Sequence, residues 1–412
     1  MSIKCILRTV VRISMGILFI FSGYVKAIDP IGSAIKFGDY FEAFGMHFFA
    51  PGSLVFGVLL AVLELMIGLC FLFGLKMKLT SLGALLFMVF MTGLTFVLAV
   101  TDLVKDCGCF GDAVTLTNWQ TFFKNIVIMP FVIYAFIERK NYKQILCLKA
   151  EWGVVAFLLI SSVGISIYTY RHLPFIDFMA YKVGVNIPEA MKIPDGAPSD
   201  KFKSAYIYAK DGKRKTFSID NLPDSTWAFV DAKNNLIKKG YVAPAQDFSI
   251  AEKQTHIHNE IFSKGGYAVF FTSDNVSKAK TKKLNVVNDI YDYSKNNNIN
   301  FIMLSGSSDA ANQSFSQQTN NYPIYFTDAT VLKSMVRSNP GMMLLKDNTI
   351  IKKWNYNDLP TVDEFKKLLT ESPEKLISNH YKCASKINYS LLIIVICLFA
   401  FFTWKSINKR DD

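Results

Sequence analysis

The chain has 412 residues, 51% of them hydrophobic, and a formal net charge of +12. Its composition changes along the chain: residues up to about 170 are rich in Leu, Phe, Val and Gly, whereas about 175–385 read as an ordinary soluble domain, so the length accommodates two units. Much of the positive charge lies in short clusters beside apolar runs, and no Arg–aromatic interleaving accompanies it, which argues against nucleic acid as a partner.

Six apolar runs are suited to crossing a bilayer as helices, since about 20 apolar residues span about 30 Å of hydrocarbon. The last run is short, but Tyr389 and Trp404 bracket it as interfacial aromatic residues do. No small-residue cleavage site follows the first run, so we expect it to be retained, and membrane lipid is the expected partner of all six. The runs lie at about 10–27, 54–75, 80–100, 119–138, 152–170 and 389–404.

The distribution of Lys and Arg predicts the orientation. With a cytoplasmic N-terminus, twelve of these residues fall in cytoplasmic segments and three, Lys26, Lys36 and Lys105, in the short opposite loops. This positive-inside bias predicts a multi-pass protein of the bacterial inner membrane with both termini in the cytoplasm. The loops 28–52 and 101–118 and the soluble part at about 171–388 are then extracytoplasmic, on the periplasmic side.

Seven cysteines are present, and in this topology Cys107, Cys109 and Cys383 face the oxidising side. Cys107 and Cys109 flank Gly108, between Asp106 and Asp112. A disulfide between such closely spaced thiols is strained and readily reduced, which suits thiol–disulfide exchange. No nearby His completes a zinc site, so no metal is expected. A bridge to Cys383 and a pair of unused thiols are the alternatives.

Glu64 lies in the middle of the second apolar run, where a carboxylate is costly and usually faces a partner inside the bundle. Lys26 and Arg12 are its candidate partners, and protonation of Glu64 is the alternative. Two interpretations follow: proton or quinone handling while the cysteine pair is reoxidised, or a polar contact between helices. Apart from that quinone, the sequence makes no cofactor evident.

The segments Gly16–Phe19 and Ser22–Lys26 resemble the first-helix signature of the DoxX-like membrane family. The spacing to Glu64, and the motif Cys107–Asp112, resemble its MauE branch; the resemblance covers about residues 8–140. It implies a four-helix membrane core with a role in disulfide formation or in maturing extracytoplasmic proteins. Cys107 and Cys109 are the candidate redox pair, with Glu64 as an intramembrane carboxylate. We assign Lys26, Asp106 and Asp112 as candidate binding residues, together with Pro340 of the soluble part.

The soluble part begins with an extended link and a small β-rich region at about 203–250. Two hairpins are expected there. The first pairs Ser204–Tyr208 with Thr216–Ile219 around Asp211-Gly212, and the second pairs Trp227–Asp231 with Ile237–Val242 around Asn234-Asn235.

From Gly266 the pattern alternates between strands and helices, which predicts an α/β domain with a mixed sheet. This order resembles the thioredoxin fold over about 265–370, and Asn339–Leu345 resembles the strand that opens with a cis-proline beside the active site of that fold. Where active members carry Cys-x-x-Cys, Thr272–Ser277 contains no cysteine, so we expect a degenerate domain that binds a polypeptide or docks onto the membrane half. The expected elements are strands at 267–272, 300–304, 323–326, 341–345 and 349–354, and helices at 278–295, 308–318, 329–336 and 362–369.

The predicted fold is an α-helical membrane bundle, a four-helix DoxX/MauE-like core plus two further transmembrane helices, with an extracytoplasmic α/β thioredoxin-like domain. The favoured function is thiol–disulfide exchange with, or maturation of, an extracytoplasmic protein. The rival is a non-catalytic scaffold or assembly factor whose degenerate domain binds partner proteins; a small-solute transporter is a third class, but no internal repeat points to it. The expected divisions are the membrane core 1–145, a fifth helix 146–172, a link and β-rich region 173–262, the thioredoxin-like domain 263–375, and a last helix with its tail 386–412.

Overall fold

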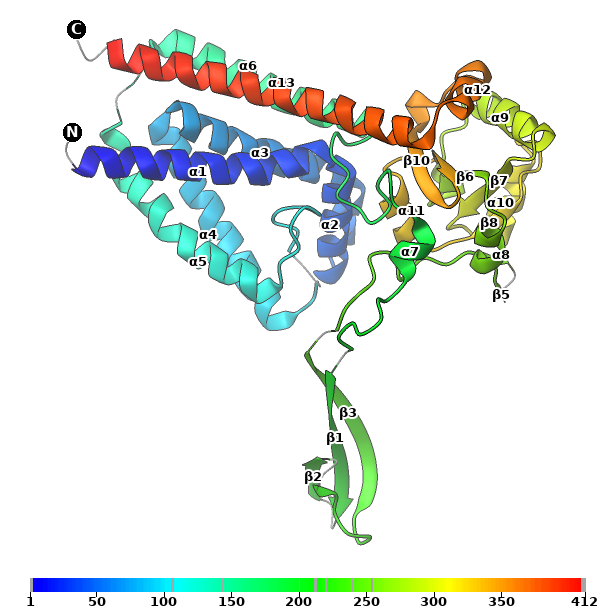
Figure 1. Ribbon diagram of the computed structural model, residues 1–412. Coiled ribbons are helices and arrows are strands. Elements are labelled where there is room, and N and C mark those ends of the chain that lie inside the picture. The colour runs from blue at the N-terminus through cyan, green and yellow to red at the C-terminus, as the bar shows by residue number, and fades with distance from the viewer. Residues whose placement is uncertain are drawn as a thin grey trace.

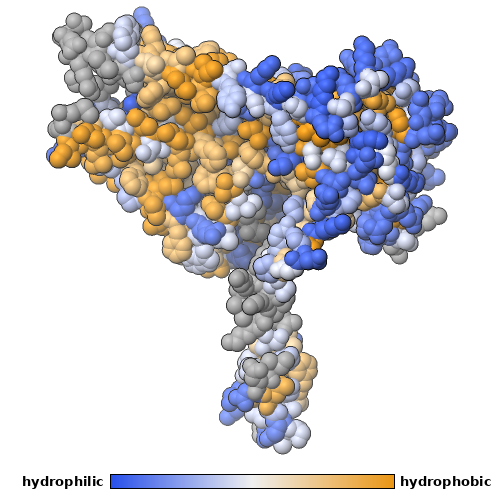
Figure 2. Space-filling view, viewed as in Figure 1, coloured by the Kyte–Doolittle hydropathy of each residue, from blue (hydrophilic) through white to orange (hydrophobic). Residues whose placement is uncertain are grey.

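The structure, a computed structural model, describes residues 3–104, 107–142, 144, 146–199, 201–210, 213–218, 221–238, 240–252 and 255–408. These residues form a bundle of long helices, a slender three-stranded arm and an α/β region, which can be distinguished in Figure 1. Apolar side chains dominate the visible face of the bundle, whereas the α/β region presents a mainly hydrophilic surface (Figure 2). The bundle and the α/β region therefore meet different surroundings.

Within the described chain, six helices are long and apolar enough to cross a membrane, and they correspond to the six predicted runs. The last helix leaves the α/β region and packs in the bundle, where the rings of Phe402 and Phe73 lie 5.4 Å apart between centroids. The chain is therefore a multi-pass membrane protein. The helices are α1 (Ile3–Ile28), α3 (Ser53–Phe73), α4 (Met77–Thr101), α5 (Asn118–Ile137), α6 (Leu148–Arg171) and α13 (Pro373–Asn408).

Residues 28–52, expected as a loop, instead contain the helix α2 (Pro30–Ala43) and the short turn η1 (His47–Gly52). The local signal is Asp29-Pro30. The Asp29 carboxylate accepts a hydrogen bond from the backbone of Gly32 at 2.9 Å, and Pro30 occupies the first turn, where its missing N–H costs nothing. The helix α2 lies across the ends of the bundle helices that face the α/β region (Figure 1).

Close contact between α1 and α3 depends on glycine. A Cβ atom on Gly23 would lie 2.3 Å from the backbone nitrogen of Leu65, and one on Gly68 would lie 2.4 Å from that of Ile20. Only a residue without a side chain lets the two backbones approach so closely, as is common where membrane helices pack. This approach brings the polar side chains of α1 and α3 within hydrogen-bonding distance.

The arm is an antiparallel sheet in the order β2–β1–β3, made of β1 (Lys201–Lys210), β2 (Lys213–Ser218) and β3 (Ala228–Lys238). The first predicted hairpin is present, with Asp211, Gly212 and Ile219 outside the described residues. The second is wrong, because β3 runs straight through the expected turn, pairing Asn234 with Ser204 and Asn235 with Lys203. Asn pairs favour turns, but here β1 supplies a partner strand for the backbone of both residues.

The α/β region contains a seven-stranded sheet in the order β10–β9–β6–β7–β8–β4–β5. The neighbours β6, β7 and β8 run parallel, whereas β9 and β10 form an antiparallel hairpin whose turn holds Asp347 and Asn348 at positive φ. Every strand predicted from Gly266 onward is present. The strands are β4 (Ala251–Glu252), β5 (Thr255–His256), β6 (Tyr267–Ser273), β7 (Asn300–Ser305), β8 (Ile324–Phe326), β9 (Gly341–Lys346) and β10 (Thr349–Asn355).

Helices cover both faces of this sheet, and two apolar cores result. Phe271 faces the core under α9, α10 and α12, and the adjacent Phe270 faces the core under α7, α8 and α11, as alternation along a strand requires. The helices are α7 (Ile187–Met191), α8 (His258–Ser263), α9 (Leu284–Asn296), α10 (Asp309–Ser316), α11 (Ala329–Met335) and α12 (Val362–Thr370).

The predicted helix from residue 278 begins later than expected. A single turn, η4 (Val276–Lys278), is followed by α9 only from Leu284. The intervening backbone is held by tertiary contacts: the N–H of Lys280 bonds to the carbonyl of Asn339, and that of Lys283 to the hydroxyl of Tyr356. These contacts compete with the helical hydrogen bonds that local sequence favours.

Candidate functional site

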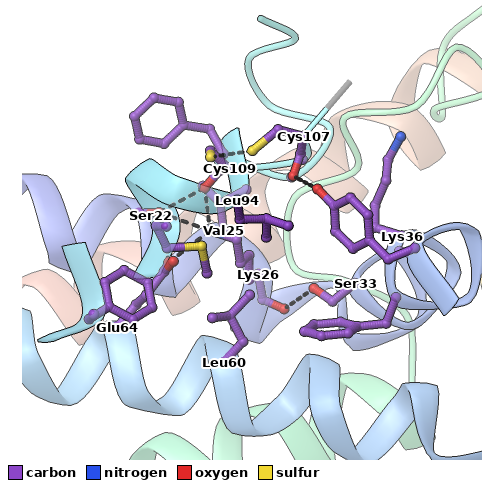
Figure 3. A pocket seen from close by; sticks show the side chains of 18 of the residues that line it. Ser22, Val25, Lys26, Ser33, Lys36, Leu60, Glu64, Leu94, Cys107 and Cys109 are labelled. Atoms are coloured by element: carbon purple, nitrogen blue, oxygen red, sulfur yellow. Dashed lines mark hydrogen bonds and ion pairs between the residues drawn. The ribbon is translucent and has the colours of Figure 1, made fainter. Parts of the chain in front are cut away.

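Cys107 and Cys109 lie together in the turn between α4 and α5. The sulfur atoms of Cys107 and Cys109 are 2.6 Å apart (Figure 3), and both thiols are free. Gly108 takes a φ of +60°, and its carbonyl accepts a hydrogen bond from the N–H of Gly111 at 2.9 Å. That left-handed conformation suits glycine and lets successive cysteine side chains point to the same side of the turn. A disulfide, with sulfurs about 2.05 Å apart, needs only a small further approach.

A buried polar cluster formed by side chains of α1 and α3 binds the backbone of this turn. Lys26 of α1 and Glu64 of α3 form an ion pair at 2.7 Å, and both side chains are almost fully buried. Ser22 donates to Glu64 at 2.7 Å and also contacts the carbonyl of Cys109 at 2.8 Å, which Lys26 binds as well. The predicted partner of Glu64 is thus Lys26, whereas Arg12 bonds to the carbonyl of Leu72 instead.

The surroundings make the two thiols unequal. The S–H of Cys107 hydrogen-bonds to the Cys109 sulfur, and the cations of Lys124 and Lys26 stabilise a negative charge there, which together lower the pKa of Cys109 to about 7. The same contact, with burial, raises the pKa of Cys107 far above its ordinary value. Cys107 is buried, whereas Cys109 is partly exposed. Cys109 is therefore the thiolate of the pair near neutral pH.

An apolar cavity of about 240 Å³ opens beside the cysteines, inside the membrane bundle. Aromatic and aliphatic side chains from several helices form most of its wall, and the polar groups gather at the end that carries Cys107, Cys109 and Lys26 (Figure 3). Tyr40 of α2 closes this end by donating a hydrogen bond to the carbonyl of Cys107. The apolar wall includes Phe37, Phe41, Leu60, Phe87, Met88, Met91 and Leu94.

The α/β region reaches the cysteine turn through Arg337. Its guanidinium lies 2.8 Å from the carboxylate of Asp112 and 3.0 Å from that of Asp29, and its side chain is 7% exposed. Asp112 belongs to the cysteine turn and Asp29 caps α2, so one arginine joins both to the α/β region. Buried, hydrogen-bonded arginines of this kind fix geometry as well as charge.

A cleft of about 760 Å³ lies between α2 and the α/β region. Ile35, Gly38 and Asp39 of α2 line it, whereas Lys36, Phe37 and Tyr40 on another side of that helix line the cavity of the cysteines. The opposite wall contributes Lys278, Lys280 and Lys333. Asp274 lies on the same wall as these lysines, and Glu42 joins Asp39 on the α2 side. The helix α2 therefore separates the cysteine cavity from a cleft that is lined by charges of both signs.

The structure brings together most of the predicted site residues. Lys26, Glu64, Cys107 and Cys109 form one site, and Asp112 joins it to the α/β region through Arg337; Asp106 lies outside the described residues. Pro340, after a cis peptide bond, is buried in the loop that carries Arg337, three residues away.

Sequence reasoning missed Asp29, Tyr40 and Arg337. The first has a local signal in its position before Pro30, and the last lies just before the flagged stretch Asn339–Leu345. Tyr40 lies in residues 28–52, whose sequence predicts a loop, and no local pattern distinguishes it.

In the described part of the chain no three His, Cys, Asp or Glu residues are grouped as a metal site would need. His256 and His258 are neighbours with ring centroids 6.2 Å apart, and His256 is exposed. Cys383 is free and exposed on α13.

Comparison with known protein families finds two matches. Residues 202–239, which cover most of the arm, match the family described as Domain of unknown function (DUF8463). No curated protein matches the chain. Residues 4–137, about a third of the chain, match the family described as Methylamine utilisation protein MauE. The membrane region that carries Lys26, Glu64 and the cysteine turn is therefore similar to MauE, and the α/β region lies outside that match.

Proposed function

We propose that the protein is a membrane thiol–disulfide oxidoreductase that acts on an extracytoplasmic protein through Cys107 and Cys109. The observation that carries this proposal is the pair itself: the sulfurs of Cys107 and Cys109 are free and lie 2.6 Å apart on a glycine turn. Lys26 of α1 holds this turn by donating a hydrogen bond to the carbonyl of Cys109. A thiolate beside a protonated thiol is the arrangement that dithiol exchange needs.

The exchange has two steps. The Cys109 thiolate attacks one sulfur of a partner's disulfide, and the other partner sulfur leaves as a thiolate. Cys107 then gives up its proton and attacks Cys109, which releases the partner's first sulfur and closes the Cys107–Cys109 disulfide. The partner gains the two electrons that the pair loses. In the reverse sequence a partner thiolate attacks Cys109 of the Cys107–Cys109 disulfide and Cys107 leaves as the thiolate; a second partner thiolate then attacks the first partner sulfur and releases Cys109. This direction oxidises the partner dithiol and leaves the pair reduced, and it is the direction that we propose, because a quinone can then reoxidise the pair.

A membrane quinone fits as the electron acceptor that returns the pair to its disulfide. One quinone takes two electrons and two protons from the dithiol and leaves as the quinol, so the step balances. The support is the cavity of about 240 Å³, apolar along most of its wall and bounded at its polar end by both cysteines and Lys26. Ligand pockets commonly combine such an apolar wall with a few convergent polar groups.

The α/β region fits a degenerate thioredoxin-like domain that receives the partner. Supporting this are the β9–β6–β7–β8 strand order and the antiparallel β9–β10 hairpin, while its sequence offers no cysteine between β6 and η4. The cleft on the other side of α2 from the cysteine cavity offers a polypeptide a place beside Arg337, which binds Asp112 of the cysteine turn.

A bacterial inner-membrane location with the cysteine turn on the periplasmic side fits the Lys and Arg bias of twelve to three. Two exposed cysteines serve as probes, because Cys147 precedes α6 and Cys383 lies at the opposite side of the bundle on α13. In intact cells an impermeant maleimide should label Cys383 and spare Cys147. Labelling of Cys147 without labelling of Cys383 would show that the protein has the opposite orientation in the membrane.

Differential alkylation in intact cells tests the redox function. The wild-type pair should shift between oxidised and reduced forms when reductant is added, and Cys107→Ser should retain a partner as a mixed disulfide on Cys109. Cys383→Ser is the matched control and should change neither result. If both cysteines stay reduced and the double variant keeps full function in cells, the proposal fails.

The non-catalytic scaffold is the second candidate, and the docking of Arg337 between Asp29 and Asp112 favours it, because this contact serves assembly without redox change. The same alkylation experiment separates the two functions: a scaffold tolerates loss of both thiols, whereas an oxidoreductase does not.

A further inference from the structure

We propose that the arm formed by β1, β2 and β3 lies on the surface of the membrane that holds the bundle, with anionic lipid headgroups as its ligand. This binding surface is independent of the redox function.

Among the arm's side chains that the structure describes, none is buried in a core. In the described stretches 204–210, 213–218 and 228–232, every side chain is at least partly exposed, and Phe229 reaches 57% and Val230 40%. Three-stranded sheets ordinarily need an apolar face that packs on something else. One face of this sheet therefore calls for a covering surface.

That face combines aromatic rings with lysines. Strand pairing places Tyr206 opposite Phe217, and Tyr208 opposite both Lys215 and Phe229, so these side chains share one side of the sheet. The Tyr208 ring lies 5.8 Å from that of Phe217 and 5.6 Å from that of Phe229. We call this set, with Lys210 and Lys213 opposite each other at its end, the aromatic–basic face.

A further aromatic ring and a lysine lie against Phe217 of the aromatic–basic face. The Trp227 ring lies 5.3 Å from the ring of Phe217, and the Lys215 ammonium lies 5.6 Å from the same ring. Tyr and Trp concentrate at membrane–water interfaces because their rings have an apolar body and a polar edge. Lysines beside them add attraction to anionic headgroups.

Charge also favours lipid. Residues 201–238 contain eight Lys and Arg against four Asp. The basic residues 213–215 are exposed in an unbroken row. Such a surplus next to aromatic rings complements an anionic bilayer, whereas a protein partner would need matched acidic and apolar patches of its own.

The position of the arm agrees with this occupant. In Figure 1 the arm runs across the direction of the bundle helices, at the level of α2 and just beyond the helix ends that face the α/β region. A bilayer around the bundle has its surface at that level. The arm therefore extends along the membrane surface rather than away from it.

Fluorescence quenching in the full-length protein tests the proposal. The protein is reconstituted in nanodiscs containing brominated lipid, with phosphatidylcholine alone or mixed equally with phosphatidylglycerol. The signal of Trp227 is the difference between the wild type and Trp227→Phe, which keeps an aromatic ring on the face. We expect quenching of this signal in the anionic nanodiscs and much less in phosphatidylcholine.

Two neighbouring residues on opposite faces supply matched variants. Lys215→Gln on the aromatic–basic face should lower the ratio of docked to free arm about fivefold, since one Lys near an anionic surface contributes about that factor. Arg214 pairs with Ala209 and lies on the other face. Arg214→Gln should lower the ratio of docked to free arm less than about twofold, because salt screens the attraction between this charge and the headgroups across the thickness of the sheet. Absence of Trp227 quenching in both nanodiscs, or equal loss in the two variants, overturns the proposal and leaves a protein as the occupant.

Discussion

Arg337 and Asp112 join the two halves of the chain through an ion pair of 2.8 Å, and Asp112 lies only three residues beyond Cys109. The α/β region, which contributes no cysteine up to α12, thus contacts the cysteine turn directly. Because the same guanidinium also binds Asp29, the cap of α2, the contact fixes the turn relative to the helix that covers the cysteine cavity.

Substitution of Arg337 by Gln should release the cysteine turn. The change removes the cation that Asp29 and Asp112 share in a largely buried place. We expect a cost of about 2 kcal/mol in docking free energy, less than that of breaking a fully buried pair because both carboxylates are partly exposed. Hydrogen exchange of residues 107–113 and 29–35 should rise in the variant. Lys333→Gln, which removes an exposed ion pair of 3.9 Å with Asp274, should leave exchange there unchanged; equal effects would contradict the assignment.

The Cys109 thiol should titrate near neutral pH. Since the pKa of Cys109 is lowered to about 7, its thiolate fraction rises as pH increases through that value, and alkylation of the reduced protein should reach half its maximal rate near there. Removing the donor in Cys107→Ala should move this midpoint upward toward the ordinary cysteine value. Stopped alkylation followed by mass spectrometry measures it.

A matched control for that titration is Cys383→Ser, which removes an exposed thiol on α13. An unchanged midpoint in Cys107→Ala would show that the hydrogen bond between the two sulfurs does not govern the charge of Cys109.

The Lys26–Glu64 ion pair should be needed for the position of the cysteine turn. Glu64→Gln leaves a buried ammonium without its counter-ion, which destabilises by about 3–5 kcal/mol and frees the lysine that holds the Cys109 carbonyl. Thermal unfolding in detergent and the alkylation rate of Cys109 should both change.

Glu151→Gln is the counterpart for this experiment, because Glu151 is equally buried and pairs with Lys76 at 3.1 Å, outside the site of Cys107 and Cys109. It should lower stability but leave the Cys109 rate as it is. If the two variants alter that rate alike, the effect is general loosening of the bundle.

Gly23→Ala should force α1 and α3 apart, since its new Cβ would lie 2.3 Å from the nitrogen of Leu65. Overpacking of this kind costs about 1–3 kcal/mol, and the separation should also weaken the Lys26–Glu64 contact. Gly83→Ala in α4, where the new Cβ would meet no heavy atom within 4 Å apart from its chain neighbours and the nearby backbone of its own helix, should be neutral or stabilising. The midpoint of thermal unfolding is measured for the two variants and the wild type. If Gly23→Ala and Gly83→Ala have equal midpoints, close packing at Gly23 does not stabilise the bundle.

Elements with a strong local pattern could be predicted from the sequence. Long apolar runs gave all six membrane helices, and the alternation of strands and helices from Gly266 gave the α/β order. Local reading failed where a distant partner decides the outcome: β1 keeps Asn234 and Asn235 in a strand, and the loops at Asn339 and Tyr356 delay the start of α9.

The candidate site divides in the same way. The sequence by itself determined the chemistry, because a Cys-Gly-Cys turn next to a membrane helix and a carboxylate inside another are visible without a structure. Only the tertiary structure decided that Lys26 rather than Arg12 meets Glu64, and that Arg337, some 225 residues away along the chain, binds Asp112. The reason is physical: composition and period report how each segment meets water or lipid, whereas contacts between segments depend on packing distances such as that across Gly23, which no local pattern encodes.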